Sequence, residues 1–235
     1  MKNTIITVWA LLSFVYANAQ QAADKKTHMG GGGFTIGYGN MDISKLQVFT
    51  PPSTSKLTND MMVIGGTGHA FLNNFVIGGS GFGIVGDVTK NDSVRVSASG
   101  GIGTFDFGYL VVNKAKLKVF PLLGIGGGGF GVQMTKTKNL SASQVSDNPS
   151  QEININQGGL VADISINMNL IPNMEYDEKS KSYGGFMTGL KVGYVYSLPR
   201  TDWRYSGGEI SGGPRFGMNM MYVKLIIGGF GSDNN

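Results

Sequence analysis

Apolar and polar residues alternate over two long stretches of the chain, as expected for β-strands whose two faces meet different surroundings. In residues 159–170 the apolar residues stand at even positions and the polar or small ones at odd positions, except for Val161. In residues 184–198 an apolar row through Leu190 opposes a row that contains Lys191 and several glycines. A helical apolar stripe of useful length is absent after the amino-terminal apolar segment. Both stretches therefore predict long strands.

Six further segments show weaker alternation or a strand-forming composition. They are residues 33–41, 62–72, 75–86, 93–103, 117–134 and 216–229. Pro121 has no backbone N–H for a ladder, so the fifth strand is expected to begin after it. The eight segments together predict an all-β fold, a single antiparallel up-and-down transmembrane β-barrel of about eight strands.

The connections between these segments differ in length in a regular way. Leu72-Asn73-Asn74-Phe75 predicts a two-residue hairpin, because asparagine tolerates the positive φ that such turns require. Long polar segments at 42–60, 136–152 and 199–214 follow the first, fifth and seventh strands. In an up-and-down barrel these three would lie at one rim, as the long external loops of outer-membrane barrels do.

A membrane barrel turns its apolar rows towards lipid and its polar rows towards the lumen. Assigning faces by the apolar row of each strand places four charged residues in the lumen: Arg95, Asp163, Lys191 and Lys224. Asp163 and Lys191 then lie near each other on adjacent strands. The fourth strand fits poorly, since Asp106 falls on the outer face unless a bulge in residues 100–103 reverses the alternation.

The amino-terminal residues have the layout of a secretory signal peptide. Lys2 precedes an apolar run from Ile5 to Tyr16, and Ala17-Asn18-Ala19 is a small-x-small cleavage site. The predicted divisions are a signal peptide at 1–19, a short N-terminal segment at 20–29, the barrel at 30–232 and a polar tail at 233–235.

Composition supports this assignment and excludes several classes of site. The chain has no cysteine, so disulfides and thiolate metal sites are excluded. Charged residues make up only 14% of the 235 residues, whereas about 25% is usual in soluble domains. The net charge of +4 and the lack of basic runs with interleaved aromatics do not indicate a nucleic-acid partner. The 38 glycines suit the narrow, curved wall of a small barrel.

His69 and Ser80 form a weak candidate polar pair. The Asn73-Asn74 turn places them as diagonal neighbours on the inner face, where a serine nucleophile and a histidine base could hydrolyse a lipid ester. No third, orienting acid is evident, and a histidine bonded within a polar interior is the favoured interpretation. The sequence therefore predicts no enzyme activity, no catalytic residues, no cofactor and no metal.

Three segments resemble small glycine-rich outer-membrane β-barrel proteins of Gram-negative bacteria, a functionally uncharacterised group. They are GFTIGYG at 33–39, GGTGHAFLNNFVIGG at 65–79 and LIIGGF at 225–230. The resemblance covers about residues 30–232 and implies a fold and an outer-membrane location, but no reaction. Such barrels usually end on an aromatic residue, whereas Phe230 is followed by five more residues.

The first functional hypothesis is an outer-membrane barrel with a side-chain-filled lumen and a structural or surface-interaction role. Its partners would be outer-membrane lipid and a surface or envelope protein that contacts loops 42–60, 136–152 and 199–214. The alternatives are a soluble barrel, like lipocalins or avidin, that binds a small apolar ligand, and a lipid-modifying outer-membrane enzyme. The side of the wall that carries the apolar rows distinguishes the first two.

Overall fold

The computed structural model describes residues 28–52, 56–91, 94–136, 152–177, 182–205 and 208–233. The predicted signal peptide and most of the segment at 20–29 lie outside these ranges, as do residues 234 and 235 of the predicted tail. No helix in the described ranges is long and apolar enough to span a membrane.

Eight long strands dominate the described part of the chain. They are β1 (His28–Met41), β2 (Asp60–Leu72), β3 (Phe75–Lys90), β4 (Val94–Tyr109), β6 (Leu117–Lys136), β7 (Glu152–Leu170), β9 (Ser182–Ser197) and β12 (Met220–Asp233). The shorter elements are the 3-10 helix η1 (Ser44–Phe49) and the strands β5 (Val112–Lys114), β8 (Glu175–Asp177), β10 (Trp203–Tyr205) and β11 (Gly208–Ile210).

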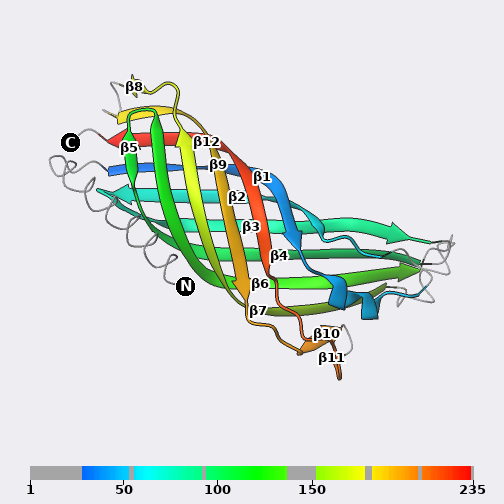
Figure 1. Cartoon of the computed structure of the whole chain (residues 1–235). Coiled ribbons are helices and arrows are strands. Elements are labelled where there is room, and N and C mark those ends of the chain that lie inside the picture. Colours follow the sequence, from blue (N-terminus) through cyan, green and yellow to red (C-terminus); the bar gives the residue numbers. More distant parts are fainter. Residues whose placement is uncertain are drawn as a thin grey trace, which may run out of the picture.

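The eight long strands form a closed ring (Figure 1). Each pairs antiparallel with the long strand that follows it in the chain, and β12 pairs with β1 to close the ring. All backbone groups along the ladders can therefore be satisfied within the wall, which is the condition for crossing lipid with strands. The predicted all-β, eight-stranded up-and-down barrel is confirmed.

Several strand boundaries differ from those predicted: β1 and β7 begin at His28 and Glu152 rather than at 33 and 159, and β12 covers Met220–Asp233 rather than 216–229. β4 continues to Tyr109, six residues beyond the predicted end at 103. β6 begins at Leu117, so Pro121 lies inside the strand. The β4–β6 ladder ends at the Gly108–Leu122 pair, and Pro121 therefore stands where no ladder bond to β4 is required of its nitrogen.

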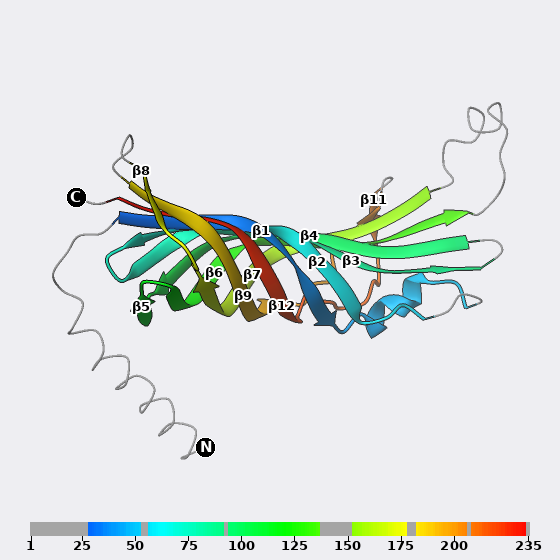
Figure 2. The ribbon, with the colours of Figure 1, turned by 90° about the horizontal axis from the view of Figure 1, so that it is seen from above.

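The two ends of the barrel differ. At one end β2 and β3 are joined by the predicted two-residue turn, in which Asn73 has a φ of 56°. The other end carries η1, the β10–β11 hairpin and the long connections. There β3, β4, β6 and β7 project past the ends of β1 and β12 (Figure 2). We call residues 86–90, 94–101, 129–136 and 152–160 of these strands the protruding wall.

The register between β3 and β4 shifts once, between Val85 and Val88. Two residues of β3, Gly86 and Asp87, stand there against one residue of β4. Such a β-bulge reverses the alternation of faces on the strand that carries it. After the bulge the even positions of β3, Val88 and Lys90, face outward, whereas before it the odd positions do.

The lumen is filled by two apolar clusters with a polar layer between them. The larger cluster, at the loop end, joins wall residues such as Val63, Ile84 and Val96 to loop residues such as Leu46 and Trp203. The smaller one, at the turn end, is built around Phe71, Phe120, Ile171 and Phe230. The predicted polar lumen is therefore found only in this middle layer, because the interior is apolar at both ends.

Candidate functional site

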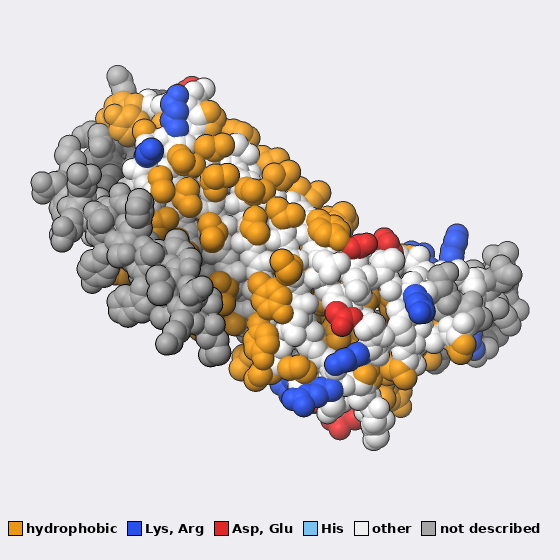
Figure 3. Space-filling model, viewed as in Figure 1, with side chains coloured by type: hydrophobic (Ala, Val, Ile, Leu, Met, Phe, Trp, Pro, Cys, Tyr) orange, Lys and Arg blue, Asp and Glu red, His pale blue; other side chains and the backbone are white. Residues whose placement is uncertain are grey.

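The faces of β7 and β9 confirm that the apolar rows lie outside the barrel. Ile164, Ile166 and Val192 are 64%, 58% and 50% exposed, whereas Asp163 and Lys191 are 1% and 0% exposed. Figure 3 shows apolar side chains covering the side of the barrel, with most charged side chains nearer its two ends. A soluble ligand-binding barrel would have the opposite arrangement, so that alternative is excluded.

An even-numbered antiparallel barrel with a lipid-facing exterior is the architecture of bacterial outer-membrane proteins. The structure therefore agrees with the predicted fold and location. It also identifies the polar layer of the lumen as the main concentration of buried charge in the described part of the chain.

Lys191 lies at the centre of the polar layer. Its Nζ atom is 3.2 Å from Oδ2 of Asp163 and 3.7 Å from Oδ2 of Asp106, and all three side chains are almost fully buried. Asp163 also accepts hydrogen bonds from the Tyr222 hydroxyl, at 2.8 Å to each carboxylate oxygen. The predicted proximity of Asp163 and Lys191 is thus observed, although Lys191 pairs in register with Asn167 and reaches Asp163 diagonally.

His69 and Ser80 lie together in the lumen, as the turn register predicts, and both contact Asp106. Oδ2 of Asp106 is 3.1 Å from Nε2 of His69 and accepts a hydrogen bond from Ser80 at 2.5 Å. Thr104 donates to the other carboxylate oxygen at 2.7 Å, and Lys191 donates to Ser80 at 3.1 Å. We call His69, Ser80, Asp106, Asp163 and Lys191 the lumen network.

Two face assignments on β4 are wrong. Arg95 is exposed on the outside of the wall and contacts none of the other predicted lumen charges. Asp106 is fully buried inside. The even positions of β4 face the lumen without interruption from Val96 to Asp106, so Asp106 faces inward without the bulge in residues 100–103 that the sequence assignment would have required.

The signal that would have found Asp106 lies in its neighbours. Phe105 and Phe107 are 53% and 49% exposed and belong to the lipid-facing row. Their alternation with Asp106 resembles that of Ile164 with Asp163, and it gives the correct face directly. The apolar row of Val96, Ala98 and Ile102 indicates the opposite face, because these residues belong to the interior cluster and not to the lipid-facing surface.

Lys224 faces the lumen, as predicted, but makes no ion pair with a described residue. Its Nζ atom lies 3.7 Å from the ring centre of Phe82 and 4.3 Å from that of Tyr222. Aromatic faces attract a cation when both are removed from water. Three of the four predicted lumen charges, Asp163, Lys191 and Lys224, therefore face the interior. Arg95 does not, and Asp106 and Lys118 are buried inside in addition.

The lumen network has the residue types of a hydrolase site but the wrong connections. Ser80 donates its proton to Asp106 rather than to His69, and Lys191 is held between two carboxylates. The two apolar clusters separate these groups from both ends of the barrel. In the described ranges no group of three or more histidine, aspartate or glutamate residues is arranged to hold a metal ion.

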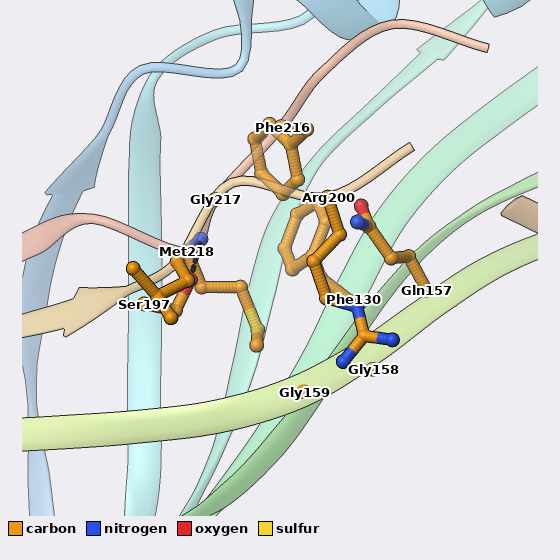
Figure 4. A pocket seen from close by; sticks show the side chains of 10 residues that line it. Phe130, Gln157, Gly158, Gly159, Ser197, Arg200, Phe216, Gly217 and Met218 are labelled. Atoms are coloured by element: carbon orange, nitrogen blue, oxygen red, sulfur yellow. Dashed lines mark hydrogen bonds between the residues drawn. The ribbon is translucent and has the colours of Figure 1, made fainter. Parts of the chain in front are cut away.

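The mouth at the loop end holds a small opening in the wall (Figure 4). The ladder between β7 and β9 ends at Val161–Ser197, and β10 resumes pairing with β7 at Asn156. The opening between them is lined by Phe130, Gln157, Gly158, Gly159, Ser197, Leu198, Arg200, Phe216, Gly217 and Met218, and it has room for about one water molecule.

Arg200 lines this opening and lies against β7. A Cβ atom built on Gly159 would lie 3.1 Å from Cδ of Arg200, so the glycine allows the arginine to lie against the strand. The guanidinium donates two hydrogen bonds to Asp202, at 2.9 Å and 2.6 Å. These bonds hold the pKa of the Asp202 carboxyl below its usual range.

The comparisons with known proteins identify no family. No protein-family model matches the chain, and no curated protein matches its sequence.

Among solved structures, the attachment invasion locus protein Ail of Yersinia pestis is 9% identical, with 88% of this chain and 99% of that chain covered and a TM-score of 0.43. The outer-membrane protein OprG of Pseudomonas aeruginosa is 13% identical, with 88% and 95% covered and a TM-score of 0.38. The outer-membrane protease OmpT of Escherichia coli is 10% identical, with 89% and 96% covered and a TM-score of 0.35. At such low identities and TM-scores these likenesses carry no conclusion about what this chain does.

Proposed function

We propose that the protein is a closed outer-membrane barrel without catalytic or conducting activity, whose loop end meets a partner outside the cell. The observation that carries this proposal is the filled lumen, where apolar clusters lie on both sides of a buried ionic layer. Eight-stranded barrels enclose little space, and here side chains occupy it.

The absence of catalysis is supported by the surroundings of the two candidate residues. His69 and Ser80 are 7% and 6% exposed, and they face the lumen rather than lipid. A membrane lipid would have to pass through the wall or through an apolar cluster to reach Ser80. The network instead matches a structural role, in which each buried charge is offset by an opposite charge or by hydrogen bonds.

The surface role is supported by the asymmetry of the ends. The loop at 42–60 folds back over the mouth through η1, and the loop at 199–214 does so through Trp203, which is fully buried. Of the loop at 136–152, residues 137–151 lie outside the described residues. The protruding wall extends beyond these folded loops and is the described part most accessible to a partner (Figure 2).

Cysteine labelling on intact cells tests the orientation, because the chain has no cysteine of its own. Ser211→Cys, in the β10–β11 region, should react with a membrane-impermeant maleimide. Asn74→Cys, in the short turn at the other end, is the matched control and should react only after the cells are opened. The reverse result would contradict the proposal.

Planar-bilayer recording and a lipid-ester hydrolysis assay test the closed lumen and the lack of catalysis. The refolded protein should give no conductance steps, and its hydrolysis rate should equal that of Ser80→Ala and of protein-free liposomes. Discrete conductance steps would refute the closed lumen. Hydrolysis that disappears in Ser80→Ala would refute the absence of catalysis.

A further inference from the structure

The outer face of the protruding wall carries a shallow, open groove between Ser99 of β4 and the asparagines Asn154 and Asn156 of β7. Its outward-facing lining residues are Ser99, Gly129, Gly131, Asn154, Asn156 and Gly158, and its volume is about 380 Å³. The register places Ser99 opposite Gly131, and Gly131 opposite Asn156. Hydroxyl and amide side chains therefore stand on either side of a floor without side chains, an arrangement that suits the hydroxyl groups of a saccharide.

Two cations lie beyond the groove towards the tip of the wall. Lys90 and Arg95 are directly opposite in the β3–β4 ladder, and both are exposed. Neither makes an ion pair with a described residue. Glu152 of β7 lies in the same cross-strand row as Arg95, with Thr135 of β6 between them. It accepts a hydrogen bond from Gln133. Like charges directly opposite in a sheet are destabilising, so an anion between them would relieve a cost built into the wall.

The β-bulge of β3 creates this pair. Without the extra residue between Val85 and Val88, the alternation of β3 would turn Lys90 to the inner face. Bulges commonly redirect a side chain at the edge of a sheet or near a functional site. Here the bulge places a lysine beside an arginine, whose planar guanidinium can bind two phosphate oxygens at once.

Below the groove the outer wall is bare down to the lipid-facing rows. Gly101 and Gly103 on β4 and Gly127 on β6 all face outward. They lie between the groove and the exposed Phe105 and Ile125. A Cβ atom at Gly103 would meet nothing within 4 Å, so the packing of the barrel does not require a glycine there. The bare surface connects the groove to the part of the wall that lies in hydrocarbon.

We propose that this outer face binds a phosphorylated glycolipid of the outer leaflet. Lys90 and Arg95 bind its phosphate, the groove between Ser99 and Asn156 holds its saccharide, and its acyl chains lie along the bare wall towards Phe105. The apolar end of the surface favours a membrane-anchored ligand over a soluble anion. The proposal relies on the external position of the loop end, which the cysteine labelling tests separately.

Native mass spectrometry of the refolded protein in detergent tests the site with three probes. They are a bis-phosphorylated lipid A glycolipid, the same glycolipid after dephosphorylation, and a soluble sulfated oligosaccharide. The wild type should bind the phosphorylated glycolipid at least tenfold more tightly than the other two. Lys90→Ala/Arg95→Ala should lose that preference, whereas Gly129→Leu, which fills the groove floor, should weaken both glycolipids.

Matched controls separate the site from general charge and from folding. Lys45→Ala/Arg215→Ala removes two other exposed cations of the loop end, and Gly68→Leu adds a side chain to another bare position, on β2; both should bind like the wild type. Heat-dependent gel mobility checks that every variant is folded. Equal binding by the wild type and Lys90→Ala/Arg95→Ala would overturn the proposal. If the soluble oligosaccharide bound as tightly as the phosphorylated glycolipid, the proposal of a lipid ligand would be wrong and the site would be assigned to a polysaccharide.

Discussion

The two parts of β7 on either side of Leu160 differ in polarity, although side chains alternate between outside and inside along the whole strand. Between Leu160 and the turn end, the outward residues Ile164 and Ile166 are apolar and the inward Asp163 is charged. Between Leu160 and the tip of the protruding wall, the outward residues Asn154 and Asn156 are polar and the inward Ile155 is buried in an apolar cluster. The polarity of the strand inverts because the medium outside changes from lipid to water.

β4 shows the same inversion between Ile102 and Phe105. Its outward row runs from Phe107 and Phe105 through two glycines to Ser99 and Arg95. The comparison teaches that an apolar row identifies the lipid-facing side only within the membrane. Beyond it, the apolar row marks the inside of the wall, as in a water-soluble sheet with one covered face.

The largest expected effect comes from the lumen network. Lys191→Ala leaves Asp106 and Asp163 buried without their shared cation, and it should lower the free energy of unfolding by about 3–5 kcal/mol. Urea unfolding in lipid vesicles measures this. Glu209→Ala removes the exposed partner of Arg204 and should cost less than about 1 kcal/mol. Similar losses for the two variants would show that the network does not hold the barrel together.

A charge on the outward face of β7 tests the inversion directly. Ile164→Arg should cost about 2–4 kcal/mol, because an arginine near the membrane midplane must leave water. Asn154→Arg, on the same face of the same strand, should unfold like the wild type. Folded fractions on heat-dependent gels and urea midpoints give the comparison. Equal tolerance at both positions would mean that lipid does not meet Ile164.

The inward face of the protruding wall should respond as a soluble core does. Val96→Ala removes two carbon atoms from a fully buried side chain and should cost about 1.5–2.5 kcal/mol, since each buried carbon contributes about 0.8 kcal/mol and a cavity remains. Ser97→Ala, its outward neighbour, should change stability by less than about 0.5 kcal/mol. Local protection of β4 amides from hydrogen exchange would reveal the difference, and its absence would contradict the assignment.

The smallest expected effect concerns the mouth. Because the pKa of Asp202 is lowered by its bonds from Arg200, their contribution is present at neutral pH and is lost as pH falls through the lowered pKa. Fluorescence of Trp203, next to this pair, should then change in acid; the second tryptophan, Trp9, lies in the predicted signal peptide. Asp202→Asn should abolish the step. An unchanged acid step in that variant would assign it to another carboxyl group.

The ring and much of the lumen follow from local sequence features. Alternation over 159–170 and 184–198 gives the faces of β7 and β9, and the Asn73-Asn74 turn fixes the register that brings Ser80 near His69. These inferences succeed because a two-residue turn leaves no freedom in pairing, and a one-residue slip would move every side chain to the other face.

The contacts across the lumen could not be predicted in the same way. Lys191 reaches Asp106 across the barrel, and Tyr222 reaches Asp163 across two ladders, at distances that depend on the stagger of the whole ring. The bulge at Val85–Val88 leaves no clear mark in the sequence, and it alone decides the side on which Lys90 appears. The sequence assigns the wrong faces to β4 because its apolar residues face lipid in one part of the strand and the interior of the barrel in the other.

The seam between β1 and β12 joins the first strand of the ring to the last, with Met29 opposite Ser232 and Met41 opposite Met220. Until β12 has formed, β1 has one open edge, and such an edge can template pairing with another chain. Pairing of segments so distant in sequence is slow, because the entropy of closing the long intervening loop must first be overcome. The β1–β12 ladder therefore carries the largest loop-closure cost in the ring, and any intermediate that lacks it exposes an edge that can pair with a neighbouring chain.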